Sequence, residues 1–290
     1  MVTTLVTPSR ARTIVRLLRI TDKRFLIGSA IVLVMAIASF VIPAISPYGP
    51  NEIIPPNALS GPTFQHVLGS DDLGRDVLVR VMAGSRISLG VAIGSGFIAV
   101  LLGVPLGLIA GFSSGVVDNL IMRPLDVLMA FPAILLAVVI VAFAGTGTTV
   151  LIIAIGVVYT PVITRVMRAT TMASRTQTYV DVARARGAST LRILVRHVLP
   201  NSIGPVVVQA SLLMGFAILL EAAFSFIGLG VRPPNPSLGS MLASERDFLA
   251  EAPWVIIAPG VAVMVLVLGF NFIGDGLRDA LDPLGRARTR

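Results

Sequence analysis

The side chains that most often carry out covalent chemistry are scarce in this 290-residue chain. It contains no cysteine and only two histidines, His66 and His197, which lie far apart in the sequence. The lack of cysteine excludes disulfides, thiolate metal sites and a cysteine nucleophile. No HExxH pair, nucleophile elbow or phosphate-binding P-loop is present. The sequence therefore predicts no active site, no metal site and no cofactor bound by this chain itself.

The charged residues that remain as candidates gather in a short stretch before the second apolar run. They are Asp71, Asp72, Arg75 and Asp76. The pattern is typical of a solvated helix start, and it predicts a short helix that continues through Met82 with Ser70 or Asp72 as its N-cap.

Glu221 is the second candidate, because it interrupts a long apolar run. Ionisable groups are rare in such runs and usually face the interior of a helix bundle. Glu221 would line a transport pathway or pair with a neighbouring helix, and the sequence favours neither. Asp126 presents the same choice, with Arg123 one turn away.

The elements that must position these residues are membrane helices. Residues are 55% hydrophobic and only 13% charged, with a mean hydropathy of +0.90. Six apolar stretches are long enough to span a bilayer, and they are continuous rather than alternating, so we expect an all-α polytopic membrane protein with six transmembrane helices. The expected spans are Phe25–Ile45 and, approximately, Ser88–Phe112, Pro124–Phe143, Thr149–Ile163, Ile203–Ile227 and Trp254–Ile273.

The formal net charge of +8 indicates sidedness rather than nucleic-acid binding, because the charges lie in short segments between apolar runs. With six spans, 18 of the 23 Lys and Arg residues fall on the side of the two termini. The positive-inside rule then places both termini in the cytoplasm. We expect the first span to be a retained signal anchor. The predicted units are a basic N-terminus (1–24), this span (25–45), an extracytoplasmic loop with a short helix (46–87), a five-helix core (88–275) and a C-terminus (276–290).

A polar cytoplasmic connection from 165 to 201 is too long for a turn and predicts two short helices. The first covers Thr178 to Arg186, with Gly187 as its C-cap glycine. The second covers Ser189 to Leu199, with Pro200 as its stop. In the second helix an apolar face follows helical spacing: Leu191, Leu194, Val195, Val198 and Leu199. Such a basic amphipathic helix lies in lipid headgroups, packs under its own bundle, or docks on a partner.

This connection resembles the cytoplasmic signature of ABC importer permeases. The family pattern opens Glu-Ala-Ala, has a glycine four residues after its second alanine, and closes on Leu-Pro. Ala183, Gly187 and Leu199–Pro200 match it, whereas Asp181 and Val182 replace the glutamate and the first alanine. The resemblance implies a coupling helix within 178–201 that sits in a groove of a cytoplasmic ATPase. The residues it assigns to coupling are Asp181, Ala183, Gly187, Ala188, Leu191, Arg192, Leu194, Arg196, His197, Leu199 and Pro200.

Three further stretches resemble the dipeptide and oligopeptide branch: residues 68–89, 221–230 and 271–283. The tail, span and Pro-rich loop resemble its second, C-type permease. The resemblance implies a homologous permease partner, two ATP-binding cassette subunits that use ATP and Mg, an extracytoplasmic binding protein near residues 71–76, and an inner-membrane location. The implied cargo is a di- or oligopeptide, or else nickel, glutathione or opines; a proton-coupled secondary transporter is the rival class.

Overall fold

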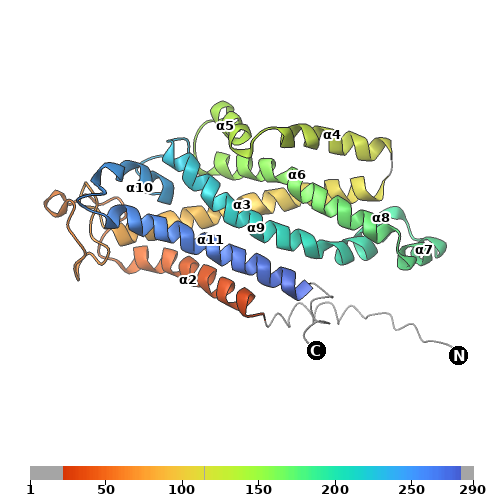
Figure 1. The fold of residues 1–290 in the computed structure, drawn as a ribbon, viewed down its shortest axis with the longest axis horizontal. Coiled ribbons are helices and arrows are strands. Elements are labelled where there is room, and N and C mark those ends of the chain that lie inside the picture. The colour runs from red at the N-terminus through yellow and green to blue at the C-terminus, as the bar shows by residue number, and fades with distance from the viewer. Residues whose placement is uncertain (1–21, 114, 282–290) are drawn as a thin grey trace.

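The computed structural model describes residues 22–113 and 115–281, and Figure 1 shows an elongated bundle of helices. Several basic residues that determine the predicted sidedness lie outside the described residues. They are Arg10, Arg12, Arg16 and Arg19 near the N-terminus and Arg286, Arg288 and Arg290 near the C-terminus.

Five helical runs of the described chain are long and apolar enough to cross a membrane. Each coincides with one of the predicted spans to within a residue or extends beyond it, which confirms the all-helical prediction. Most of these helices continue past the predicted apolar stretch into polar residues. They can do so because the backbone hydrogen bonds of a helix form in water as well as in lipid. The long helices are α2 (Lys23–Ile45), α3 (Val77–Phe112), α6 (Thr148–Arg175), α9 (Leu199–Phe226) and α11 (Trp254–Leu281).

The predicted third span is broken into two helices. Helix α4 (Val116–Ala130) and helix α5 (Ala133–Ala144) are bent by 95° relative to each other. The break lies at Phe131 and Pro132, where proline supplies no N–H and forces the preceding residue into an extended conformation. A sixth crossing exists if this bent pair is counted as one span, so the predicted span over 124–143 is present in two pieces that meet at Pro132.

The start of the second span also differs from the prediction. Helix α3 runs without interruption from Val77, and its N-cap is Asp76 rather than Ser70 or Asp72. The Asp76 carboxylate accepts a hydrogen bond from the Val79 N–H at 2.9 Å, which satisfies one of the free donors of the first turn. Residues 77–82, which the sequence assigned to a short helix before the span, are the first turns of α3 itself.

Glycines bring the long helices close together. Gly103, Gly107 and Gly111 of α3 face α6, and a Cβ added at Gly107 would lie 2.6 Å from the Thr164 carbonyl oxygen. This GxxxGxxxG run therefore packs inside the chain, as small residues allow. Gly28 of α2 makes a similar close approach to α11 at Gly269.

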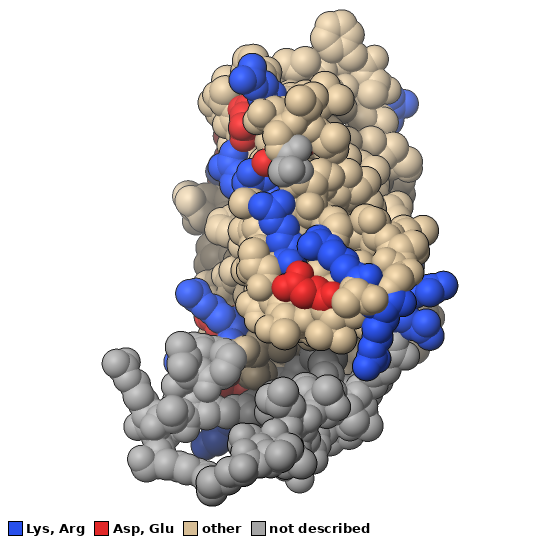
Figure 2. Space-filling model, turned by 90° about the vertical axis from the view of Figure 1, so that its right-hand side faces the viewer, with Lys and Arg blue, Asp and Glu red and all other residues tan. Residues whose placement is uncertain are grey.

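The two ends of the bundle carry different features. One end holds the short helices α7 (Thr178–Ala185) and α8 (Thr190–Ile193) together with the start of α2 and the end of α11 (Figure 1). There Arg24 pairs with Asp279 at 3.3 Å. Lys and Arg side chains gather over this end (Figure 2). The opposite end holds η1 (Pro55–Asn57), α10 (Leu238–Ser244) and η3 (Arg246–Phe248).

Candidate functional site

The turn between α7 and α8 is built from the residues that suggested the cytoplasmic signature. Gly187 has φ +75°, a left-handed conformation that favours glycine. Its N–H donates to the Arg184 carbonyl at 2.9 Å, and the Ala188 N–H donates to the Ala183 carbonyl at 3.1 Å. These two bonds form a Schellman motif, in which the glycine lies four residues after the alanine whose carbonyl closes the turn. The predicted C-cap is confirmed, with α7 ending at Ala185.

Pro200 does not stop the second short helix. The chain passes from α8 through a π-helical turn, η2 (Leu194–Val198), directly into α9, so that Thr190–Phe226 is one continuous helical run of 37 residues. Pro200 occupies the first turn of α9, where its missing N–H removes no α-helical bond. The predicted break before the fifth span is therefore wrong.

The predicted apolar face of this segment is divided between the interior and the surface. Val198 is fully buried, as is Ile193, which the periodicity did not select. In contrast, Leu191 and Val195 are 71% and 55% exposed. The π-turn explains the mismatch, because its i→i+5 bonds shift the phase of the residues on either side. Leu194 and Leu199 are half-buried, between the packed interior and the exposed surface.

Exposed charges surround these two apolar side chains. Arg192 and Arg196 are exposed and His197 is half-buried. On α7, Asp181 pairs with Arg184 at 3.8 Å with both side chains more than half exposed, a geometry worth little stability.

Three core helices hold the α7–α8 hairpin in place. Arg175 donates to the carbonyls of Gly111 and Ser113 at 3.2 and 2.9 Å, which caps the end of α3. Ser174 of α6 and Ser202 of α9 share a hydrogen bond of 2.7 Å. Val180 and Ile193 are buried in a cluster with residues of α6 and α9. The hairpin is therefore packed as part of the bundle.

Two ion pairs fasten α4 along α6. Asp118 accepts two hydrogen bonds from Arg168, both at 2.6 Å, a bidentate arrangement that is among the stronger charge pairs. Asp126 pairs with Arg165 at 2.7 Å across the same interface. For Asp126 the structure thus favours pairing between helices, and the partner is not the nearby Arg123.

Glu221 is fully buried between α3 and α9. Ser88 of α3 donates to one carboxylate oxygen at 2.6 Å, and Ser225 donates to the other at 2.8 Å. Of the two roles that the sequence left open, the geometry favours pairing with a neighbouring helix.

The charged group at positions 71–76 is buried, in contrast to the expected solvated helix start. Asp71 is 1% exposed and Asp76 is 4% exposed. Asp76 accepts a hydrogen bond from His66 at 2.9 Å in addition to capping α3. Asp71 pairs with both Arg75 and Arg80. Asp72 retains about a third of its side-chain exposure.

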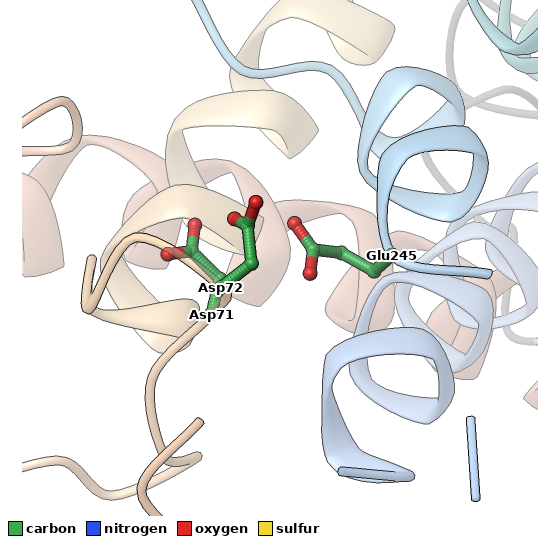
Figure 3. Close-up of side chains that lie close together, drawn as sticks. All are labelled: Asp71, Asp72 and Glu245. Carbon is green, nitrogen blue, oxygen red and sulfur yellow. The ribbon is translucent and has the colours of Figure 1, made fainter. Parts of the chain in front are cut away.

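Glu245, which the sequence analysis did not select, belongs to the same charged group. It follows α10, and its carboxyl points toward Asp71 and Asp72 (Figure 3). Oxygens of these three carboxyls lie within 4.8 Å of one another. Arg80 was also missed. Glu245 lies far along the chain from the other members, and Arg80 lies inside an apolar helix. Only a structure or co-varying homologues could reveal such partners.

Comparisons with known proteins determine the family. Residues 103–286 match the family described as binding-protein-dependent transport system inner membrane component, which is more than half of the chain. The chain belongs to this family. It is thus a multi-pass permease of the ABC importer type.

Curated relatives cover nearly the whole permease. It is 42% identical over 262 residues to the dipeptide transport system permease protein DppC of Alkalihalophilus pseudofirmus, covering 90% of this chain and 86% of the relative. It is 43% identical over 268 residues to the di/tripeptide permease DppC of Pseudomonas aeruginosa, covering 90% and 88%. The glutathione permease GsiD of Pectobacterium atrosepticum is 42% identical over 257 residues, with 88% and 85% covered.

A solved structure supports the permease fold. The MetNI methionine ABC transporter in an inward facing conformation matches with a TM-score of 0.57 and 21% identity, covering 74% of this chain and 97% of the solved one. The bundle described above is therefore an ABC importer permease fold.

Proposed function

We propose that this permease forms the translocation path of an ATP-driven importer of di- or oligopeptides, together with a homologous second permease. Two ATP-binding cassette subunits bind at the α7–α8 end, and an extracytoplasmic binding protein delivers cargo at the α10 end. The peptide cargo is supported by the two DppC relatives, each at least 42% identical over about 90% of the chain. Glutathione is the second candidate, because GsiD is equally similar.

The observation that carries the ATPase-coupling proposal is the surface of the α7–α8 hairpin. It exposes Leu191 and Val195 beside Arg192 and Arg196, while its opposite face is packed into α6 and α9. An apolar protrusion surrounded by basic side chains is complementary to a groove that is lined by apolar residues and flanked by acidic ones. The hairpin is continuous with α9 and follows α6, whose last residue, Arg175, caps α3. A partner that moves the hairpin must therefore move these helices too.

The basic residues at the same end support a cytoplasmic orientation, following the positive-inside rule. Asp71 and Asp76 at the other end are buried, so a docked binding protein would touch Asp72 and its exposed surroundings rather than those two carboxylates. ATP and Mg act in the partner subunits, and this chain contributes the membrane path and the docking surface.

A pair of glycine variants tests the coupling proposal. A Cβ at Gly187 meets no atom within 4 Å, so the Gly187→Trp side chain leaves the backbone into open space, at the cost of the strain of φ +75°. Gly228, at the other end of α9, has the same open surroundings and φ +81°, so Gly228→Trp is the matched control. Gly187→Trp should insert normally but lose the P-loop ATPase on purification in mild detergent. Gly228→Trp should keep it.

Normal ATPase recovery and normal uptake by Gly187→Trp would refute the coupling assignment. Cargo is tested separately with reconstituted complex, by competition of labelled dipeptide uptake with unlabelled dipeptide, glutathione and nickel. Competition by glutathione alone would replace the peptide proposal. Uptake driven by a proton gradient without ATP would support the secondary-transporter alternative.

A further inference from the structure

Five charged side chains meet beneath the surface where the loop 46–76 contacts the segment that follows α10. They are Asp71, Asp72, Arg75, Arg80 and Glu245. Three carboxylates and two guanidinium groups carry a formal net charge of −1. The Arg75 guanidinium lies among the carboxyls, 2.6 Å from Asp71, 3.2 Å from Asp72 and 4.0 Å from Glu245.

The carboxyl oxygens in this group differ in how well they are satisfied. Asp71 Oδ1 accepts from the N–H groups of Leu73 and Arg75, and Oδ2 contacts the guanidinium groups of Arg75 and Arg80. Glu245 Oε1 accepts from Ser244 at 3.2 Å. Glu245 Oε2 has no hydrogen-bond partner in the described part of the chain, although the side chain is only 2% exposed. A buried ionised oxygen without a donor is unfavourable.

A bound metal ion is the first explanation to consider, because the three carboxyls lie within 4.8 Å of one another. However, Arg75 already occupies the space between them, and both oxygens of Asp71 are engaged. A divalent cation would also change the charge of the group from −1 to +1. A single proton brings it to zero and turns the unsatisfied Oε2 into a donor, on a carboxyl that points toward Asp71 and Asp72 (Figure 3).

We propose that Glu245 is a proton-binding site that holds the segment 238–248 against the loop 46–76. With the proton bound, the neutral carboxyl stays buried beside Asp72. Without it, repulsion from Asp71 and Asp72 favours separation of the two segments. This proton site is formed by residues of this chain alone, whatever the cargo and the partners of the permease.

The electrostatics of the site agree with this geometry. Burial, followed by the negative charges of Asp72 and Asp71, raises the pKa of Glu245 to about 7, while Ser244 and Arg75 act in the opposite direction. Arg80 completes the group from α3. In η3, Arg246 and Asp247 pair with each other at 3.5 Å in exposed positions.

The sign and size of the pH effect follow from linkage. Because the pKa of Glu245 is higher in the closed arrangement than its ordinary value of 4.5, the closed arrangement is favoured at low pH and loses this advantage as pH rises through about 7. If opening restores the ordinary pKa, the opening equilibrium increases about tenfold between about pH 6 and about pH 8.

Hydrogen–deuterium exchange on the purified complex in lipid nanodiscs tests the proposal. Amides of 46–76 and 238–253, corrected for intrinsic rates, should exchange about tenfold faster at the higher pH in the wild-type chain. Glu245→Gln, which carries a neutral amide, should remain protected at both values. Glu251→Gln removes an exposed carboxyl from the same connection and should behave like the wild type.

Infrared difference spectra read the proton directly. The carbonyl stretch of a protonated carboxyl should titrate near neutral pH in the wild type and in Glu251→Gln, and be absent from Glu245→Gln. A wild-type chain that shows no such band and no pH-dependent protection would overturn the proposal, whether or not the variants fold. Protection that depends on added Ca²⁺ rather than on pH would replace the proton by a cation.

Discussion

Close packing between α3 and α6 allows a quantitative test with a single methyl group. A Cβ at Gly107 would lie 2.6 Å from both the Met167 Cβ and the Thr164 carbonyl oxygen, whereas ordinary contacts begin near 3.4 Å. Gly107→Ala therefore forces the two helices apart locally by about 0.8 Å at a contact with backbone, which cannot rotate away. Inserting a methylene into a packed interface costs about 1–3 kcal/mol.

Gly90 on the same helix is the matched control, because a Cβ there meets no atom within 4 Å. Both alanine variants gain the same helix propensity, about 0.8–1 kcal/mol. This gain cancels when the two variants are compared, so the unfolding free energy of Gly107→Ala should lie about 1–3 kcal/mol below that of Gly90→Ala. Since 1.4 kcal/mol is a factor of ten, the unfolding equilibria should differ by about 5- to 150-fold.

Equilibrium unfolding of the purified chain in mixed detergent, followed by circular dichroism, measures this difference. Coincident transitions for the two variants would refute the assignment of the glycine run to packing within the chain. Retention of stability by Gly107→Ala together with loss of a co-purifying second permease would place that surface between subunits instead.

Two other expectations concern the loop 46–76 and the orientation of the bundle. Asp76→Ala removes both the N-cap of α3 and the partner of His66, so the free energy of unfolding should fall by about 1–3 kcal/mol. Asp76→Asn keeps a capping oxygen and should lose less stability. Equal losses of stability in the two variants would argue against the cap. A reporter fused after Arg290 should be active only in the cytoplasm, and an extracytoplasmic signal would mean an odd number of crossings.

Local features of this fold were predictable from the sequence. Continuous apolar runs determine membrane helices because lipid offers backbone groups no other partner. Gly187 was recognisable as a helix end because the left-handed conformation it adopts depends on neighbouring residues alone. Pro132 is a local signal of the same kind, because its missing N–H and fixed φ mark the place within the predicted third span where α4 and α5 separate.

Long-range features were not predictable in the same way. Ser88 and Glu221 are 133 positions apart in the sequence, and Asp71 and Glu245 are farther apart still. One sequence contains no measure of the distance between such residues in space. The apolar face expected over Leu191–Leu199 is divided between interior and surface for a local reason, because the π-turn at Leu194–Val198 interrupts the 3.6-residue period of an α-helix.

The continuous run from Thr190 to Phe226 has a mechanical consequence. Its 37 residues form a rod about 55 Å long at 1.5 Å per residue. One tip bears the exposed Leu191, and Glu221 lies near the other, held to α3 through Ser88. If the Glu221 contact acts as a pivot, the hairpin lies roughly 45 Å away along the rod. A tilt of about 3–5° about that pivot then displaces the hairpin by roughly 2–4 Å, so a small angular change in the membrane becomes a movement of atomic size at the docking surface.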